Sequence, residues 1–256
     1  MIGASGIIAA MHRQDVAANN LANIQTVGFK PDSSFTIPRE AARQEDGLLN
    51  LPSNALLERL GSGVLLAPNR INFAQGTLVR SRNPFDVAIE GSGFLTVAGA
   101  GSKPGTTETR LTRDGRLTLD ANGKLVTVTQ GQPVLDEAGQ PITLNPGHEF
   151  TIESDGTISQ GGAAVAKLGF VDVPSRGALK KVGDGQYALP GGSAAVKTSA
   201  TGRIVQYATE ESGADPIRAM MDVQEASDLV GTTAKIMQLH DDLMNKAVNT
   251  LGRVTA

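Results

Sequence analysis

Apolar residues near the start of the chain recur at intervals of three and four positions, which is the spacing of one face of an α-helix. These residues are Ile7, Ile8, Met11, Ala18, Leu21 and Ala22. Gly28 and Pro31 follow them, and Gly and Pro are residues that end helices. The pattern predicts a helix and a turn over residues 1–30.

The last part of the chain carries a longer apolar stripe. Asp215 is suited to cap a helix and Pro216 to occupy its first position. A heptad-like series follows at Val230, Thr233, Met237, His240, Met244, Ala247, Leu251 and Val254, and Leu229, Ile236 and Leu243 broaden it. A helix of about 40 residues is about 60 Å long, which exceeds the length of one small domain. We therefore predict a helix over residues 213–256 that packs with residues 1–30.

Short runs of alternating apolar and polar residues lie between these two segments, separated by turn signals. Asn122-Gly123 and Asp155-Gly156 are flanked by such runs, and this pattern predicts β-hairpins. We predict an antiparallel all-β domain over residues 84–208. The fold class is thus mainly β with terminal α-helices, and the helices pair as a coiled-coil-like layer. Residues 31–83 contain four Pro and are predicted to be an extended connector that orders against a partner.

Composition excludes several classes of function. The 256 residues carry 23 Lys and Arg against 26 Asp and Glu, a net charge of −3, so we expect no binding to nucleic acid. The absence of Cys excludes thiol catalysis, disulfides and Cys-ligated metals. The three His residues lie far apart in the sequence. No run approaches the roughly 18 apolar residues of a membrane helix, so we expect no membrane insertion.

The glycine-rich segments do not complete a cofactor-binding motif. Gly91-Ser92-Gly93 begins like a dinucleotide fingerprint, but Thr96 stands in place of the third Gly. Gly99 to Lys103 lacks the Gly-Lys-Ser/Thr ending of a phosphate-binding loop. The Gly-x-Ser-x-Gly motif of hydrolases is absent. We therefore expect a protein that is not an enzyme, with no catalytic residue, no cofactor and no metal site.

Residues 17–30 contain Asn-Asn-Leu-Ala-Asn followed by Thr-x-Gly-Phe-Lys. This segment resembles the N-terminal signature of bacterial flagellar rod and hook proteins. Residues 75–78, 83–94, 111–115 and 120–127 resemble the same family's entry into its β domain and the strand pair that follows. The family's C-terminal helix usually opens with Ser-Asn-Val, where this chain has Ser212-Gly213-Ala214.

The resemblance implies a structural subunit of the flagellar basal-body rod. Such a subunit self-assembles through its terminal helices into a helical axial structure and transmits torque from motor to hook. The length and the single β domain resemble the rod proteins more than the longer hook protein, and residues 134–142 and 154–159 favour the proximal-rod type. The alternatives are a distal-rod or hook-related axial subunit, or a component of a non-flagellar helical assembly.

The resemblance also implies partners and a location. The partners are other rod and hook-basal-body subunits, further copies of the same chain, and the flagellar type III export apparatus. The location is the periplasmic rod of the basal body. The first residues lack the cationic segment and the cleavage site of a secretory signal, so we expect export without a cleaved signal peptide.

We expect the assembly interface to involve both termini, because one helix pair leaves part of its apolar stripe unburied in a single subunit. The candidate residues are Ile7, Met11, Asn19, Asn20, Leu21, Asn23, Gly28, Phe29, Val230, Met237, Met244 and Leu251. The three Asn residues either fix the register between helices through hydrogen bonds or cap a helix end. Gly28 supplies either a positive φ or room for a close approach.

Overall fold

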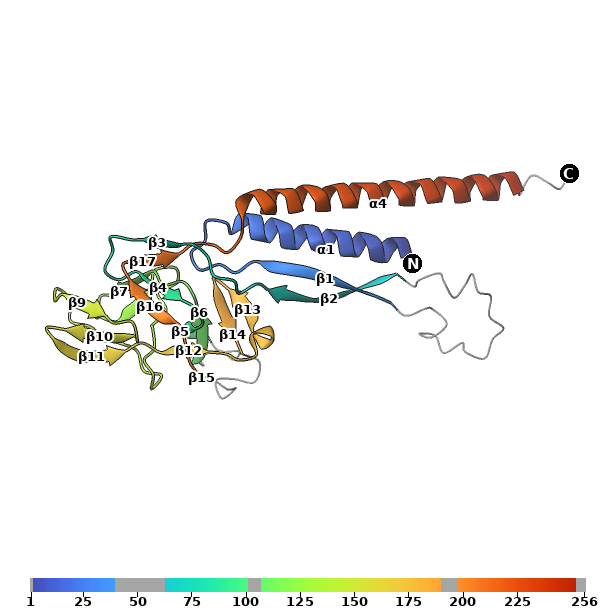
Figure 1. Cartoon of the computed structure of the whole chain (residues 1–256). Coiled ribbons are helices and arrows are strands. Elements are labelled where there is room, and N and C mark those ends of the chain that lie inside the picture. The colour runs from blue at the N-terminus through green and yellow to red at the C-terminus, as the bar shows by residue number, and fades with distance from the viewer. Residues whose placement is uncertain (1, 40–62, 101–106, 190–197, 252–256) are drawn as a thin grey trace, which may run out of the picture. The chain divides into compact units, whose positions relative to one another are not determined.

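The computed structural model describes residues 2–39, 63–100, 107–189 and 198–251 (Figure 1). The chain divides into two compact units. The helical unit contains the described residues of 1–22, 32–70 and 215–256, and the β unit contains those of 23–31 and 71–214. The chain therefore crosses between the units four times, after residues 22, 31, 70 and 214.

The helical unit contains two helices and a pair of strands. Helix α1 spans Ile2–Ala22 and helix α4 spans Pro216–Leu251, while strand β1 (Asp32–Pro38) pairs with strand β2 (Val64–Ile71). The two helices pack together and run in opposite directions, since Arg13 forms an ion pair with Glu225 and Gly6 lies near Thr233 (Figure 1). The Asp215 carboxylate accepts hydrogen bonds from the N–H groups of Ile217 and Arg218, which confirms the predicted cap.

The β unit consists of short strands that pair in antiparallel fashion. Its largest sheet has the order β13-β14-β6-β5-β12-β15, a second has the order β11-β10-β9, and three further pairs are β16-β4, β17-β3 and β7-β8. The strands are β3 Leu78–Arg80, β4 Val87–Glu90, β5 Phe94–Ala100, β6 Thr107–Thr112, β7 Leu117–Leu119, β8 Leu125–Thr127, β9 Phe150–Ile152, β10 Thr157–Gln160, β11 Ala163–Lys167, β12 Phe170–Asp172, β13 Lys180–Gly183, β14 Gln186–Ala188, β15 Thr198–Ser199, β16 Arg203–Gln206 and β17 Ala208–Glu210, with a 3-10 turn η1 at Arg176–Ala178.

The predicted hairpins are present where the turn chemistry indicated them. Asn122-Gly123 joins β7 to β8, and Asp155-Gly156 joins β9 to β10. Both glycines have positive φ, +76° and +91°, which a glycine adopts without steric strain. The predicted fold class, mainly β with terminal helices that pack together, is confirmed.

Two apolar clusters form the core of the β unit. The larger one contains Leu95, Val97, Leu117, Leu125, Val134, Leu168 and Ile158, all completely buried. The smaller one is aromatic: the ring of Phe94 lies 5.6 Å from that of Phe73 and 5.7 Å from that of Tyr187. Such ring packing adds to the free energy gained by burial and holds β5 and β14 in place.

The described part of residues 31–83 contributes to both units. Strands β1 and β2 pair within the helical unit, and β3 pairs with β17 within the β unit. Residues 40–62 of this segment lie outside the described part of the chain. Neither of the two described helices contains an apolar stretch able to span a bilayer.

Candidate assembly surface and its buried anchor

The face of α1 toward α4 is made of small residues. Ala10 and Ala17 are buried, and on α4 Ala219 and Ala226 are buried in turn. A Cβ placed on Gly6 would lie 3.8 Å from the Thr233 side chain. Small side chains let two helices approach closely, so this face pairs the helices within one chain.

A second face of α1 is fastened to the strand pair by polar side chains. The Asn20 amide donates to the Asp32 carbonyl at 2.8 Å and accepts from the Asp32 N–H at 2.9 Å. The His12 Nε2 lies 2.8 Å from the Asn69 Oδ1, and the Ser5 hydroxyl accepts from the Val64 N–H. Asn20 therefore imitates the pairing of a neighbouring strand. These two hydrogen bonds of Asn20 join a helix to a strand rather than one helix to another.

The third face of α1 is open. Ile8 and Met11 are 55% and 52% exposed. Both lie on the predicted apolar stripe, part of which is expected to stay uncovered in a single subunit, and the face buried against α4 carries Ala10 and Ala17. Ile7 and Leu21 are half-buried at the edges, and Asn19 is exposed. This face, which carries larger apolar side chains than the buried one, is exposed in the single chain.

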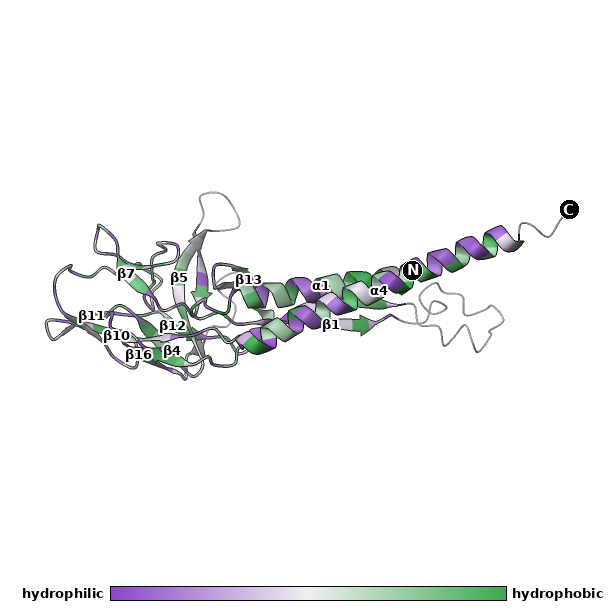
Figure 2. Cartoon of the chain, turned by 90° about the horizontal axis from the view of Figure 1, so that it is seen from above, coloured by the Kyte–Doolittle hydropathy of each residue, from purple (hydrophilic) through white to green (hydrophobic). Residues whose placement is uncertain are grey.

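Helix α4 continues well beyond the start of α1 (Figures 1 and 2). It has 36 residues against 21 in α1. Because Gly6 lies near Thr233, the first residue of α1 falls near Met237, and residues 235–250 are all exposed. The overhang, residues 238–250, is about 20 Å long. Its exposed large apolar side chains are Leu239, Leu243, Met244 and Val248.

The predicted α4 residues differ in burial along the helix. Val230 is half-buried, Met237 is 38% exposed and Met244 is 56% exposed. Leu251 closes the helix, and its side chain lies outside the described part of the chain. The stripe thus changes from a face covered within the chain to an open face as α4 passes the end of α1.

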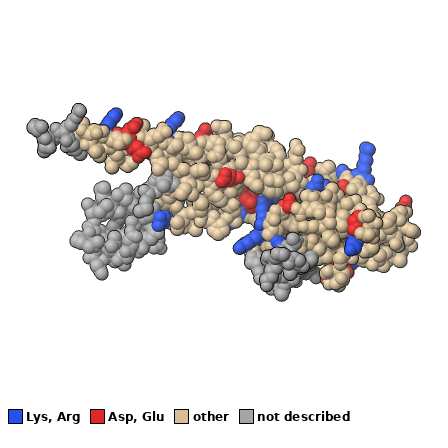
Figure 3. Space-filling view, turned by 180° about the vertical axis from the view of Figure 1, so that it is seen from behind, with Lys and Arg blue, Asp and Glu red and all other residues tan. Residues whose placement is uncertain are grey.

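Strands β1 and β2 add further exposed apolar side chains to the helical unit. Phe35, Ile37, Leu65 and Leu66 are each at least two-fifths exposed. We call these four residues, with Ile8, Met11 and the overhang, the apolar assembly surface. On the face seen in Figure 3, much of the molecular surface carries no charge, and acidic and basic side chains are interspersed.

The turn that follows α1 is buried inside the β unit. Gly28 has a φ of +70°, its N–H donates to the Glu210 carbonyl at 2.7 Å, and a Cβ there would lie 2.5 Å from the Arg113 carbonyl oxygen. Both expected features, the positive φ and the close approach, are confirmed. Asn23 accepts a hydrogen bond from the Thr26 hydroxyl within this turn.

Phe29 is 7% exposed, and the Lys181 ammonium lies 4.3 Å above its ring. The Phe29 carbonyl accepts from the Gly213 N–H at 2.9 Å. A Cβ on Gly213 would lie 3.2 Å from the Pro31 ring, a crowded distance. This contact gives a physical reason for glycine at the position where the chain departs from the family's Ser-Asn-Val.

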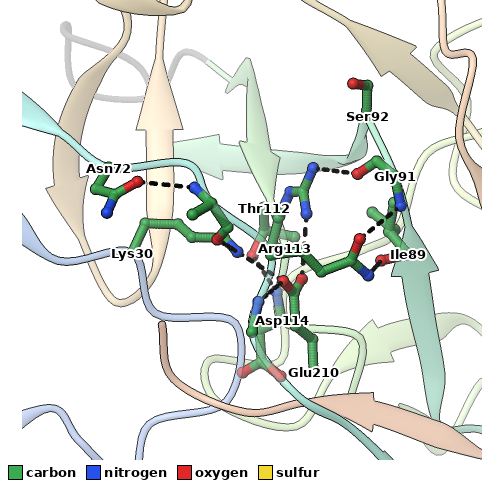
Figure 4. Close-up of polar contacts among 12 residues, drawn as sticks. Lys30, Asn72, Ile89, Gly91, Ser92, Thr112, Arg113, Asp114 and Glu210 are labelled. Carbon is green, nitrogen blue, oxygen red and sulfur yellow. Dashed lines mark hydrogen bonds and ion pairs between the residues drawn. The ribbon is translucent and has the colours of Figure 1, made fainter. Parts of the chain in front are cut away.

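Three charged side chains form a buried cluster beside this turn (Figure 4). The Glu210 carboxylate lies 2.6 Å from the Lys30 ammonium and 3.3 Å from the Arg113 guanidinium. The side chains of all three are at most 1% exposed. Glu210 also accepts from the Gly76 N–H, Lys30 donates to the Ala74 carbonyl, and Arg113 donates to the Gly91 carbonyl.

The cluster holds more positive than negative charge. Two cations share one carboxylate, and Arg113 Nε has no hydrogen-bond partner among the described residues. Burial away from water lowers the pKa of Lys30, while its hydrogen bond to Glu210 opposes this effect. Removal of Glu210 alone would leave two buried cations without a counter-charge.

Four of the five segments that carry the family resemblance meet at this cluster. Lys30 ends the first segment, and Gly76 belongs to the second. Gln75 donates to the Ile89 carbonyl and accepts from the Gly91 N–H in the third, and Arg113 lies in the fourth (Figure 4). Sequence reasoning missed Lys30, Arg113 and Glu210 as a group. The sequence signal was a charged residue close to a buried apolar one: Lys30 follows Phe29, and Arg113 lies two positions after Leu111. Glu210 lies outside all of these segments.

Comparison with known protein families shows that two regions of the chain match flagellar families. The family described as flagella basal body rod protein matches residues 2–30, and the flagellar hook protein FlgE/F/G D1 domain matches residues 88–160. The first region is α1 and the buried turn, and the second extends from β4 to β10. The fold and the two matched regions define a protein of the flagellar rod and hook class.

Full-length relatives narrow this class. The flagellar basal-body rod protein FlgF of Caulobacter vibrioides is 31% identical, over 99% of this chain and 97% of that protein. FlgF of Rhizobium meliloti is 28% identical over 98% and 96%, and FlgG of Agrobacterium fabrum is 26% identical over 94% and 95%. The chain belongs to the family of flagellar basal-body rod proteins.

Proposed function

We propose that this chain is a structural subunit of the flagellar basal-body rod that assembles through its helical unit into a helical axial structure. In this proposal the structure transmits torque from motor to hook. The observation that supports it most directly is the exposed apolar stripe of the overhang. A lone helical segment of this length is marginally stable in water, so the overhang requires a neighbour.

The magnitude of the apolar contribution is sufficient for association. Complete burial of a large apolar side chain contributes about 1.5–3 kcal/mol. The four overhang side chains are 56–68% exposed, so their burial together represents about 4–7 kcal/mol. A dissociation constant of 1 μM corresponds to about 8 kcal/mol, and association also has an entropic cost. Several such contacts per subunit therefore give a stable polymer.

The two open regions of the helices differ in sequence and shape, which favours head-to-tail contact. Ile8 and Met11 lie on α1, whereas Leu239 and Leu243 lie on the overhang of α4. A contact between two different surfaces, repeated without closure, produces a helical filament. The proposed partners are further copies, other rod and hook-basal-body subunits, and the export apparatus during secretion.

The finer assignments belong to this proposal as well. The subunit is placed in the periplasmic rod, is exported without a cleaved signal peptide, and has no catalytic role. The proximal-rod position rests on the resemblance of residues 134–142 and 154–159. In this scheme Gly28 and Phe29 act by anchoring α1 to the β unit, and Ile7, Met11, Leu21, Val230, Met237, Met244 and Leu251 line helix contacts.

The test replaces two overhang residues by charged ones. Leu239→Glu with Leu243→Glu is expressed in a strain that lacks its own copy of the gene, beside wild type and the control Gln238→Glu with Asn245→Glu. All four positions are exposed, and both variants add two carboxylates to the overhang. We expect the apolar variant to lose motility and to be absent from purified basal bodies, while its circular dichroism matches that of the control. Full motility with both apolar positions charged would refute assembly through the overhang.

A further inference from the structure

All four crossings of the chain between the units lie close to the buried cluster in sequence. The N–H of Gly28, after the first crossing, donates to the Glu210 carbonyl. Asn72 follows the third crossing, and Pro31 is the last residue before the second crossing. The Asn72 N–H donates to the Pro31 carbonyl. The Gly213 N–H, just before the fourth crossing, donates to the Phe29 carbonyl. The β unit therefore fastens every segment that leads into the helical unit.

The side chains of the cluster cross-link the same segments. Glu210 accepts from Lys30, from the Gly76 N–H and from Arg113, and so joins residues that are up to 180 positions apart in sequence. Lys181, which lies on strand β13, donates a hydrogen bond to the Lys30 carbonyl at a distance of 2.6 Å. Among the described residues of this group, Glu210 is the one carboxylate, and it is the acceptor that Lys30, Gly76 and Arg113 share.

A buried ion pair is a poor means of stabilising a fold, because apolar residues of the same volume do so at least as well. Its best-attested use is to select one arrangement over others. The cluster borders the smaller apolar core, since the Arg113 guanidinium lies 5.3 Å from the centre of the Phe94 ring, while the three charged side chains themselves add no apolar burial.

We propose that Glu210 is a positioning residue that holds the four crossing segments in one arrangement, so that force on the helices enters the β unit through this cluster. The inference rests on the proposed function, because only a rod subunit experiences such force. Glu210→Gln removes the charge and keeps the shape of the side chain. Lys30→Met is the milder substitution, because the Glu210 carboxylate still pairs with the Arg113 guanidinium and the cluster then carries no net charge.

The controls make the same chemical changes at an exposed ion pair of the β unit. Lys167 lies 2.9 Å from Glu137, and both side chains are at least two-fifths exposed. Glu137→Gln matches Glu210→Gln, and Lys167→Met matches Lys30→Met. Exposed pairs contribute little to stability, so the controls isolate the effect of the buried cluster.

The first experiment is amide hydrogen exchange on the purified full chain. We expect the Gly28, Asn72 and Gly213 amides to exchange at least about tenfold faster in Glu210→Gln and Lys30→Met than in their controls, while β5 and β8 remain protected. Unchanged exchange at these three amides would overturn the inference. If Glu210→Gln does not fold, the comparison of amide exchange in Lys30→Met with that in Lys167→Met tests the inference in the same way.

The second experiment measures rotation under load in cells. Variants incorporated into basal bodies at the wild-type level are tested in media of increasing viscosity. We expect the cluster variants to stop rotating at a lower viscosity than their controls. Equal tolerance of load would overturn the inference. Failure of the wild-type gene to restore motility would instead refute the proposed function and leave the exchange result standing.

Discussion

Gly28→Ala tests whether the buried turn depends on close approach of the backbone. At Gly28 a Cβ would lie 2.5 Å from the Arg113 carbonyl oxygen and 2.8 Å from the Asp114 nitrogen. Both are backbone atoms, so the clash is relieved only by movement of the chain. Such movement also weakens the hydrogen bond from the Gly28 N–H to the Glu210 carbonyl.

The expected loss of stability combines these effects. The left-handed conformation costs an alanine about 1 kcal/mol, the weakened hydrogen bond adds about 1 kcal/mol, and displaced backbone beside a buried ion pair adds about 1–3 kcal/mol. The free energy of unfolding should therefore fall by about 3–5 kcal/mol.

Gly131→Ala is the matched control. Gly131 has a φ of +64°, close to that of Gly28, and no atom lies within 4 Å of its Cβ position. Its replacement should cost only the conformational term of about 1 kcal/mol. Urea unfolding of both variants, followed by circular dichroism, measures the difference. Free energies of unfolding that agree within about 0.5 kcal/mol for Gly28→Ala and Gly131→Ala would refute the close-approach argument.

Three further predictions concern the cluster and the start of α4. Glu210→Gln should lower the free energy of unfolding by about 3–5 kcal/mol and Lys30→Met by less, because only the first leaves two unpaired buried cations; an inverted order in urea titrations would contradict this charge balance. Burial lowers the pKa of Lys30 below its ordinary 10.5, so the unfolded chain binds the Lys30 proton more tightly than the folded chain does. The free energy of unfolding should therefore rise with pH up to about 10.5. Urea titrations across this pH range should show a smaller rise in Lys30→Met than in the wild type. Asp215→Ala should cost about 1 kcal/mol and speed amide exchange at Ile217 and Arg218, whereas Asp241→Ala should not.

Local chemistry explains which elements the sequence predicted well. The Asn122-Gly123 and Asp155-Gly156 hairpins depend on residues within a few positions of each other, and both are present. The α4 cap depends on Asp215 and the two N–H groups that follow it. Such interactions need no distant partner, so a single sequence contains all the information that determines them.

The buried cluster could not be predicted in the same way. Glu210 contacts Lys30 and Arg113, which are 180 and 97 positions away. In the sequence each charged residue looks like an ordinary surface residue, because Lys, Arg and Glu are rarely buried without a partner. Only the folded chain shows that the partners coincide.

The apolar stripe of α1 shows a different limit of sequence reasoning. Periodicity identifies the face with the largest apolar residues, and here that face includes Ile8 and Met11, which the chain itself leaves exposed. The face buried against α4 is made of Ala10 and Ala17, which weigh little in a hydropathy pattern. A periodic apolar stripe predicts that a helix face is buried, but it does not distinguish burial within the chain from burial against another chain.

That ambiguity bears on how an assembling protein divides its apolar residues. Pairing of α1 with α4 through small side chains leaves the larger ones, Ile8 and Met11 on α1 and Leu239 and Leu243 on the overhang, for contact between chains. A helix pair held only by small residues gains little apolar burial, so its position depends on fixed points such as Asn20 at the strand pair. In the proposed assembly, such a subunit keeps its helices paired within the chain and leaves these four large side chains for contacts in the polymer.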